Sequence, residues 1–72
     1  MFEHRVDLSK PSDQWHIHLK DCAPNRPRKF CMATLEKGGR DVAMFQPTKA
    51  QLMKIRAGRG VIRITRRQQF PV

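Results

Sequence analysis

The residues best suited to chemistry are the bases in the second half of the chain, and that chemistry is anion binding. Residues 42–72 contain seven bases and no Asp or Glu, so they carry +7 of a total charge of +9. These bases are Lys49, Lys54, Arg56, Arg59, Arg63, Arg66 and Arg67. Because charge of one sign repels itself unless a counter-charge is bound, the sequence predicts an anionic partner for this half.

The spacing of the arginines favours contacts with phosphates. Arg63 and Arg67 are four residues apart on an expected strand, so they would share one face about 13 Å apart at roughly 3.3 Å per residue. Further candidate binding residues come from an expected helix end, a turn and a loop: Arg56, Arg59, Arg26 and Arg28. The alternative is a solvated basic surface with no specific ligand.

The aromatic content favours contacts with the nucleic-acid backbone over sequence-specific contacts with nucleobases. The chain has no Tyr, no aromatic strand of the kind that stacks RNA bases, and no second helix placed for a helix-turn-helix. Because no aromatic residues are interleaved among the Lys and Arg residues, a duplex backbone or a protein surface is favoured over single-stranded nucleic acid as the partner.

Two functions from different classes remain open. The first is a small non-enzymatic nucleic-acid-binding module that contacts mainly the backbone. The second is a phage- or plasmid-type regulatory or inhibitor protein that docks on an acidic surface of a larger nucleic-acid enzyme, such as RNA polymerase.

A second group of residues has the donor types of a zinc site. His16, His18, Cys22 and Cys31 could supply two nitrogens and two sulfurs. Their spacing does not match a paired-cysteine knuckle, so no metal is expected. A disulfide between the two cysteines is the other possibility, but without an export signal free thiols are expected.

Catalysis is not expected from this sequence, nor are a cofactor or a small-molecule substrate. His4, His16 and His18 are possible bases, and Asp13 and Asp21 could orient them. However, the sequence shows no nucleophile elbow, no phosphate-binding glycine loop and no carboxylate pair at a useful spacing.

Length and composition limit the chain to one small domain. It has 72 residues and a pI near 10.9, and a chain of this size buries only about 60% of its unfolded surface. No apolar run approaches the roughly 20 residues of a membrane span. The start of the chain lacks the apolar segment of a signal peptide, so a cytoplasmic location is expected.

The elements that would hold the candidate residues are mainly strands. Residues 14–20 alternate apolar and polar side chains, which is typical of a half-buried strand with Trp15 in the core. Residues 29–35 and 41–45 predict a hairpin around Gly38 and Gly39. Val6 and Leu8 alternate with charged residues and indicate a further short strand.

One helix and one last strand complete the expected fold. Thr48 and Gln51 have capping-box spacing, so a helix is predicted from Lys49 to about Ala57, with Gly58 as its stop. Residues 61–67 predict the final strand, with Ile62 and Ile64 facing inward. The result is an α+β domain over residues 1–72, with about four antiparallel strands, one helix at about 48–57, and mobile ends at 1–5 and 68–72.

Some apolar residues have no clear place in this core. They are Met1, Phe2, Met53, Phe70 and Val72. Met and Phe suit adaptable protein-binding surfaces, but the same residues could close a thin core or lie in frayed ends. Both alternatives stay open.

Overall fold

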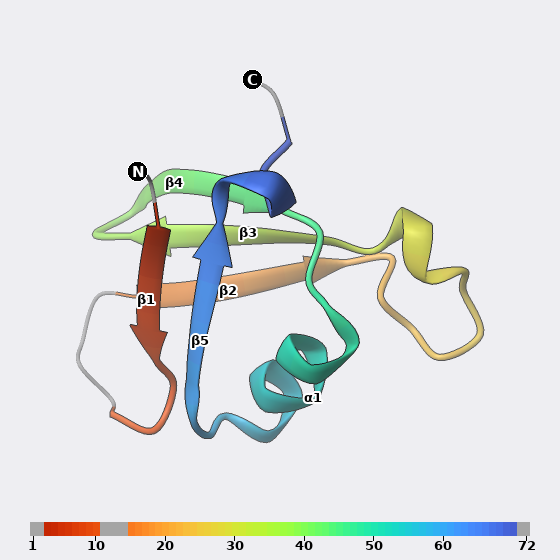
Figure 1. Cartoon of the computed structure of the whole chain (residues 1–72), viewed down its shortest axis with the longest axis horizontal. Coiled ribbons are helices and arrows are strands. Elements are labelled where there is room, and N and C mark those ends of the chain that lie inside the picture. The colour runs from red at the N-terminus through yellow and green to blue at the C-terminus, as the bar shows by residue number, and fades with distance from the viewer. Residues whose placement is uncertain (1–2, 11–14, 71–72) are drawn as a thin grey trace.

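The structure is a computed structural model that describes residues 3–10 and 15–70, and it is a small α+β fold (Figure 1). The regular elements are β1 (Glu3–Asp7), β2 (Trp15–Lys20), β3 (Met32–Lys37), β4 (Arg40–Phe45), α1 (Lys49–Ala57) and β5 (Val61–Thr65). Two short 3₁₀ turns, η1 (Arg28–Phe30) and η2 (Arg66–Gln68), connect them. The described residues thus form five strands, where about four were predicted.

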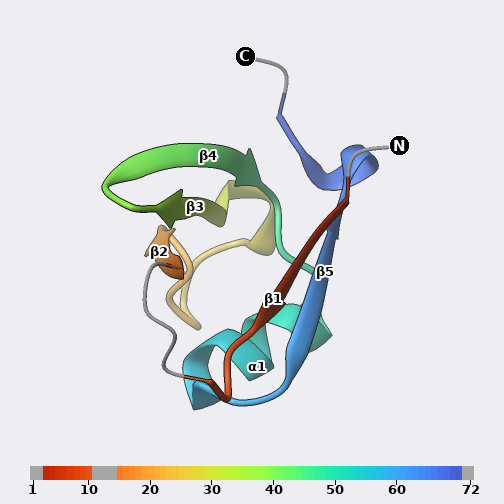
Figure 2. The ribbon, with the colours of Figure 1, turned by 90° about the vertical axis from the view of Figure 1, so that its left-hand side faces the viewer.

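The strands form two antiparallel sheets that share one core. β2, β3 and β4 make a three-stranded sheet in that order, and β1 pairs with β5 as a separate ribbon. The ribbon crosses the sheet at a steep angle (Figure 1), and α1 lies across one end of the space between them (Figure 2). Val6, Ile62 and Ile64 of the ribbon pack against Leu35 and Phe45 of the sheet.

The predicted strand at 14–20 is confirmed as β2, with residue 14 outside the described residues. Its side chains alternate between half-buried and exposed along the whole strand, as period-two spacing requires. Trp15 is only half-buried and packs at the margin of the core, although a central place was expected. Its ring faces the Lys37 ammonium at 4.7 Å.

The predicted hairpin is confirmed as β3 and β4, but its first strand begins at Met32 rather than at residue 29, because residues 28–30 form η1. Gly38 and Gly39 join the strands with φ angles of +60° and +83°, which glycine adopts without the clash that a Cβ would cause. The pairing shifts register between Leu35 and Glu36, so β4 bulges near its start. Val42, in this irregular part of the strand, is exposed.

The predicted helix and both of its ends are confirmed. The Gln51 backbone N–H donates to the Thr48 hydroxyl at 3.1 Å, and the Thr48 N–H donates to the Gln51 side chain at 2.9 Å. Gly58 ends α1 in the left-handed conformation with φ at +66°. Leu52 is buried, whereas Met53 is 65% exposed.

The predicted last strand was too long. β5 ends at Thr65, because Thr65 and Gln68 form a second capping box that turns residues 66–68 into η2. Arg67 lies in η2 and therefore does not share a strand face with Arg63, as the prediction required. Ile62 and Ile64 do face inward, as predicted.

After η2 the chain is held against β4. Gln46 N–H donates to the Gln68 carbonyl at 2.9 Å, and Phe70 N–H donates to the Met44 carbonyl at 2.9 Å. At the other end, β1 pairs along β5 from Glu3 onward. Residues 1, 2, 71 and 72 lie outside the described residues, and mobility of the ends stays a prediction.

Candidate anion-binding site

A disulfide between Cys22 and Cys31 organises the basic loop, with a Cα–Cα distance of 4.4 Å. The expectation of free thiols was therefore wrong. Antiparallel pairing of β2 with β3 sets Lys20 opposite Met32 and leaves the two cysteines just beyond the paired ends. Disulfides persist mainly in oxidising compartments, so the disulfide is unusual for cytoplasm. The cytoplasmic location stays a prediction.

The zinc hypothesis does not fit this arrangement. The sulfur atoms of Cys22 and Cys31 are bonded to each other, so neither is a thiolate that could bind a metal. Within residues 3–10 and 15–70, no group of three or more His, Cys, Asp and Glu side chains is placed to hold a metal ion.

The disulfide loop and α1 enclose a groove of about 390 Å³, which we call the loop–helix groove. Its lining residues are Asp21, Cys22, Ala23, Pro24, Arg26, Arg28, Cys31, Lys49, Leu52, Met53 and Arg56. Four of them are bases and one is an acid, and most of the others are apolar. Two distant segments of the chain thus contribute like charges to one surface.

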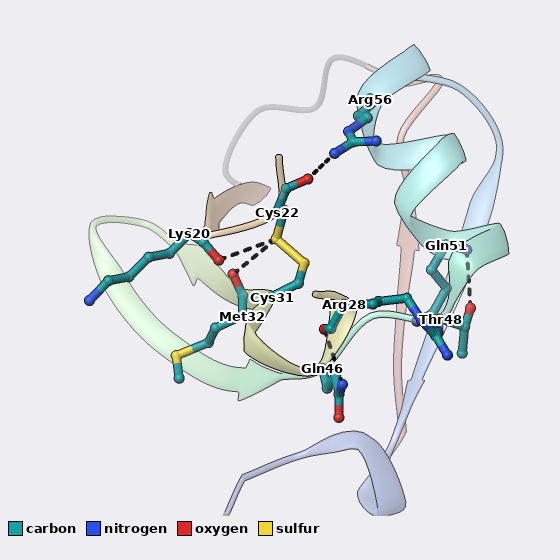
Figure 3. Close-up of a disulfide and its surroundings, with 9 residues drawn as sticks. All are labelled: Lys20, Cys22, Arg28, Cys31, Met32, Gln46, Thr48, Gln51 and Arg56. Carbon is teal, nitrogen blue, oxygen red and sulfur yellow. Dashed lines mark hydrogen bonds between the residues drawn. A yellow bond between two sulfur atoms is a disulfide. The ribbon is translucent and has the colours of Figure 1, made fainter. Parts of the chain in front are cut away.

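Arg56 ties the helix to the loop. Its Nη2 donates a hydrogen bond to the Cys22 carbonyl oxygen (Figure 3). A guanidinium carries five N–H donors in a planar fork, and this bond uses one of them. The side chain is exposed, so Arg56 can hold the loop and still offer donors to an anion.

Lys49 lies at an electrostatically unfavourable position in the fold. It is the first residue of α1, whose first turn contains no acidic residue. The N-terminus of a helix carries a partial positive charge, so an anion there is stabilising and a cation is not. The same position lines the loop–helix groove, where an anion would meet both the lysine and the helix terminus.

A second groove, of about 280 Å³, lies beside η2, and we call it the turn groove. Its lining residues are Arg28, Gln46, Pro47, Thr48, Arg67, Gln68, Gln69 and Phe70. Arg28 lines both grooves. In Figure 3 its side chain extends from the disulfide loop toward Thr48 at the start of α1.

A network of hydrogen-bonded glutamine side chains holds the residues around the turn groove. Gln51 and Gln68, the third residues of the two capping boxes, exchange hydrogen bonds through their side-chain amides. Gln68 also donates to the Gln46 carbonyl at 3.2 Å, and Gln46 donates to the Arg28 carbonyl at 3.3 Å. This network was not predicted from the sequence, although Thr65-Arg66-Arg67-Gln68 repeats the spacing of Thr48-Lys49-Ala50-Gln51.

The remaining predicted binding residues lie outside both grooves: Lys54, Arg59, Arg63 and Arg66. Lys54 donates to the Val61 carbonyl at 3.2 Å, which fixes the turn after α1. Arg63 pairs across the ribbon with Arg5, a base that the sequence analysis did not select. The predicted set is therefore divided between the grooves and other parts of the surface.

The candidate catalytic residues are not gathered in a groove. His16 and His18 lie on the exposed face of β2, where the His18 ring contacts the Glu36 carboxylate at 2.9 Å. His4 is half-buried in β1, and Asp21 lines the loop–helix groove without a histidine beside it in that lining. Asp13 lies outside the described residues.

Two of the unassigned apolar residues line the grooves. Met53 lies in the loop–helix groove and Phe70 in the turn groove. Met1, Phe2 and Val72 lie outside the described residues. In the described part of the chain, no helix is long and apolar enough to cross a membrane.

Comparison with known proteins assigns no family to this fold. The chain matches no protein-family model, no curated protein and no solved structure.

Proposed function

We propose that this protein is a small, non-enzymatic nucleic-acid-binding module that holds the phosphate backbone in the loop–helix groove. The supporting observation is that Arg26 and Arg28 of the disulfide loop and Lys49 and Arg56 of α1 line this one groove. Guanidinium groups bind phosphate oxygens through paired N–H donors, and a lysine adds a point charge. Phosphate is the anion that this donor set fits best.

The bases outside the grooves have a different part in this proposal. Lys54, Arg59, Arg63 and Arg66 are exposed and add to a field of one sign around the molecule. Such a field raises the rate at which a polyanion arrives without fixing its position. Their loss should therefore reduce affinity less than loss of the bases in the loop–helix groove.

The direct test compares two pairs of arginines that carry the same charge. Arg26→Gln with Arg28→Gln removes two groove contacts, and Arg59→Gln with Arg66→Gln removes two charges outside the grooves. Fluorescence anisotropy with a labelled single strand of about twelve nucleotides reports the affinity. Each phosphate contact contributes about 0.7 to the slope of log affinity against log salt on a single strand. At about 0.1 M salt, one decade below 1 M, the loss of two contacts in the groove pair should therefore lower the affinity on the order of 25-fold. The control pair should weaken it by much less.

Equal losses in both pairs would contradict a localised site. Absence of binding to single strands and duplexes at about 50 mM salt, where phosphate contacts are strong, would refute the proposal itself. A tagged protein that retains one stoichiometric partner from a nuclease-treated lysate would then support the second function. That function is regulation or inhibition by docking on an acidic surface of a larger nucleic-acid enzyme such as RNA polymerase.

A further inference from the structure

The two grooves meet at one arginine and differ in chemistry. Arg28 lines both of them. The loop–helix groove is lined by four basic residues, whereas the lining of the turn groove combines Phe70 with Arg67, Arg28 and three glutamines. One groove suits phosphates, and the other brings an aromatic residue together with two arginines.

The turn groove has the components that recognise an unpaired base. Bases stack on aromatic rings and on the planes of arginine guanidinium groups, and this stacking tolerates any base. Phe70 is half-buried and lines the turn groove. Arg67 also lines the turn groove, because it lies in η2 and not in a continuation of β5.

The walls of the turn groove are fixed before any ligand binds. Gln46 and Gln68 are held by the amide network, and the Phe70 backbone N–H is bonded to β4. A surface that is already ordered binds with less loss of conformational entropy. One donor there has no partner: Gln69 Nε2 is buried without a hydrogen bond in the described part of the chain. An unsatisfied donor is costly, and a turn of the Gln69 amide into the groove would let it donate to a base acceptor.

We infer that the turn groove takes one base of a single-stranded nucleic acid while the neighbouring phosphates lie in the loop–helix groove. Arg28, between the two, would contact the phosphate that joins them. This inference rests on the proposed function and narrows its partner to single strands, because a paired base inside a duplex does not expose its face for stacking. It departs from the preference for duplex or protein that the sequence suggested, since Phe70 and Arg28 come to line one groove only in the folded chain.

The test separates phosphate binding from base binding. Two labelled DNA strands of about twelve nucleotides are compared, one of thymidines and one with the same backbone but no bases. One stacked base should make the thymidine strand bind about 5- to 150-fold more tightly. Phe70→Leu, which keeps apolar bulk but removes the ring, should bring this ratio close to one. Phe70→Trp should preserve the ratio.

Phe30 provides the matched control. It is 57% exposed and follows Arg28 by two residues, but it lines neither groove. Phe30→Leu should leave the ratio unchanged, and circular dichroism confirms that each variant is folded. If the wild-type protein binds both strands equally, or if Phe70→Leu keeps the ratio, the base site is refuted while the phosphate groove stands. If neither strand binds at low salt, the base site is refuted, and the proposed function fails as well if a duplex does not bind either.

Discussion

Replacement of Lys49 by Gln should stabilise the fold and weaken binding at the same time. Lys49 begins α1, and no acidic residue in the first turn offsets its charge at the positive end of the helix. Removing a cation from this position stabilises by about 0.3–1 kcal/mol. In a domain of this size that corresponds to a rise in Tm of about 1–8 °C. Gln has nearly the same helix propensity as Lys, so the backbone contribution changes little.

The expected binding loss follows from the four bases of the loop–helix groove. If each contacts one phosphate of a single strand, log affinity falls with log salt at a slope of about −2.8, and the variant should show about −2.1. Between about 50 and 200 mM salt, wild-type affinity should fall about 50-fold and variant affinity about 18-fold. A general loss of structure would lower both stability and affinity. Higher stability together with weaker binding would therefore show that Lys49→Gln acts on the binding site itself.

Thermal melting by circular dichroism and anisotropy titrations over a salt series measure the two effects on the same preparations. Lys10→Gln is the matched control, because Lys10 is exposed and lines neither groove. It removes the same charge and should change neither the slope nor the Tm by a comparable amount. An unchanged slope in Lys49→Gln would show that the groove does not hold phosphate. A fall in Tm would refute the electrostatic reasoning about the helix terminus.

The other predictions concern the frame of the grooves. Cys22→Ser with Cys31→Ser should lower the free energy of unfolding by about 2.5–3 kcal/mol, because the bond closes a short loop; urea denaturation measures this, and equal stability of variant and wild type would contradict it. Alkylation followed by mass spectrometry should find no free thiol before reduction and two after it. Gln68→Ala should lower the free energy of unfolding by about 1–3 kcal/mol, because it leaves partners of the amide network unpaired. If the replacement of an exposed Gln by Ala lowers it by the same amount, the network is not stabilising.

Local patterns in the sequence predicted the elements that depend on neighbouring residues. The capping box at Thr48, the glycine pair of the β3–β4 hairpin and the alternation along β2 are all short-range signals. Each requires only a few consecutive residues to act together. The helix and β2 were therefore predicted close to their observed bounds, whereas β3 begins three residues later than predicted, after η1.

The end of β5 shows how two valid local patterns can compete. Residues 61–67 alternate like a strand, but Thr65 and Gln68 have the spacing that starts a turn, and the turn forms. The deciding interaction is not local, because the Gln68 amide is also bonded to Gln51 and Gln46. A comparison of the two Thr-x-x-Gln segments would have indicated the second turn.

The disulfide could not be derived from the spacing of the cysteines alone. It depends on the register of β2 with β3, which sets the two cysteines beside each other only after Lys20 is paired with Met32. The loop that it closes brings Arg26 and Arg28 to the groove. The location of the candidate site is thus a property of strand pairing, although its positive charge is a property of composition.

The same arrangement explains why the acid-free half of the chain predicts the sign of the partner's charge better than it predicts the location of the binding site. Four bases face one groove that contains a single carboxylate, and their mutual repulsion acts to separate the loop from α1. The bond from Arg56 to the Cys22 carbonyl holds the loop to α1 against this repulsion, and the disulfide fixes the loop residue that accepts that bond. A bound phosphate would remove the repulsion that these bonds oppose. Binding and closure of the loop should therefore be coupled, and the cysteine-to-serine variant should bind phosphate more weakly even though it keeps every base of the groove.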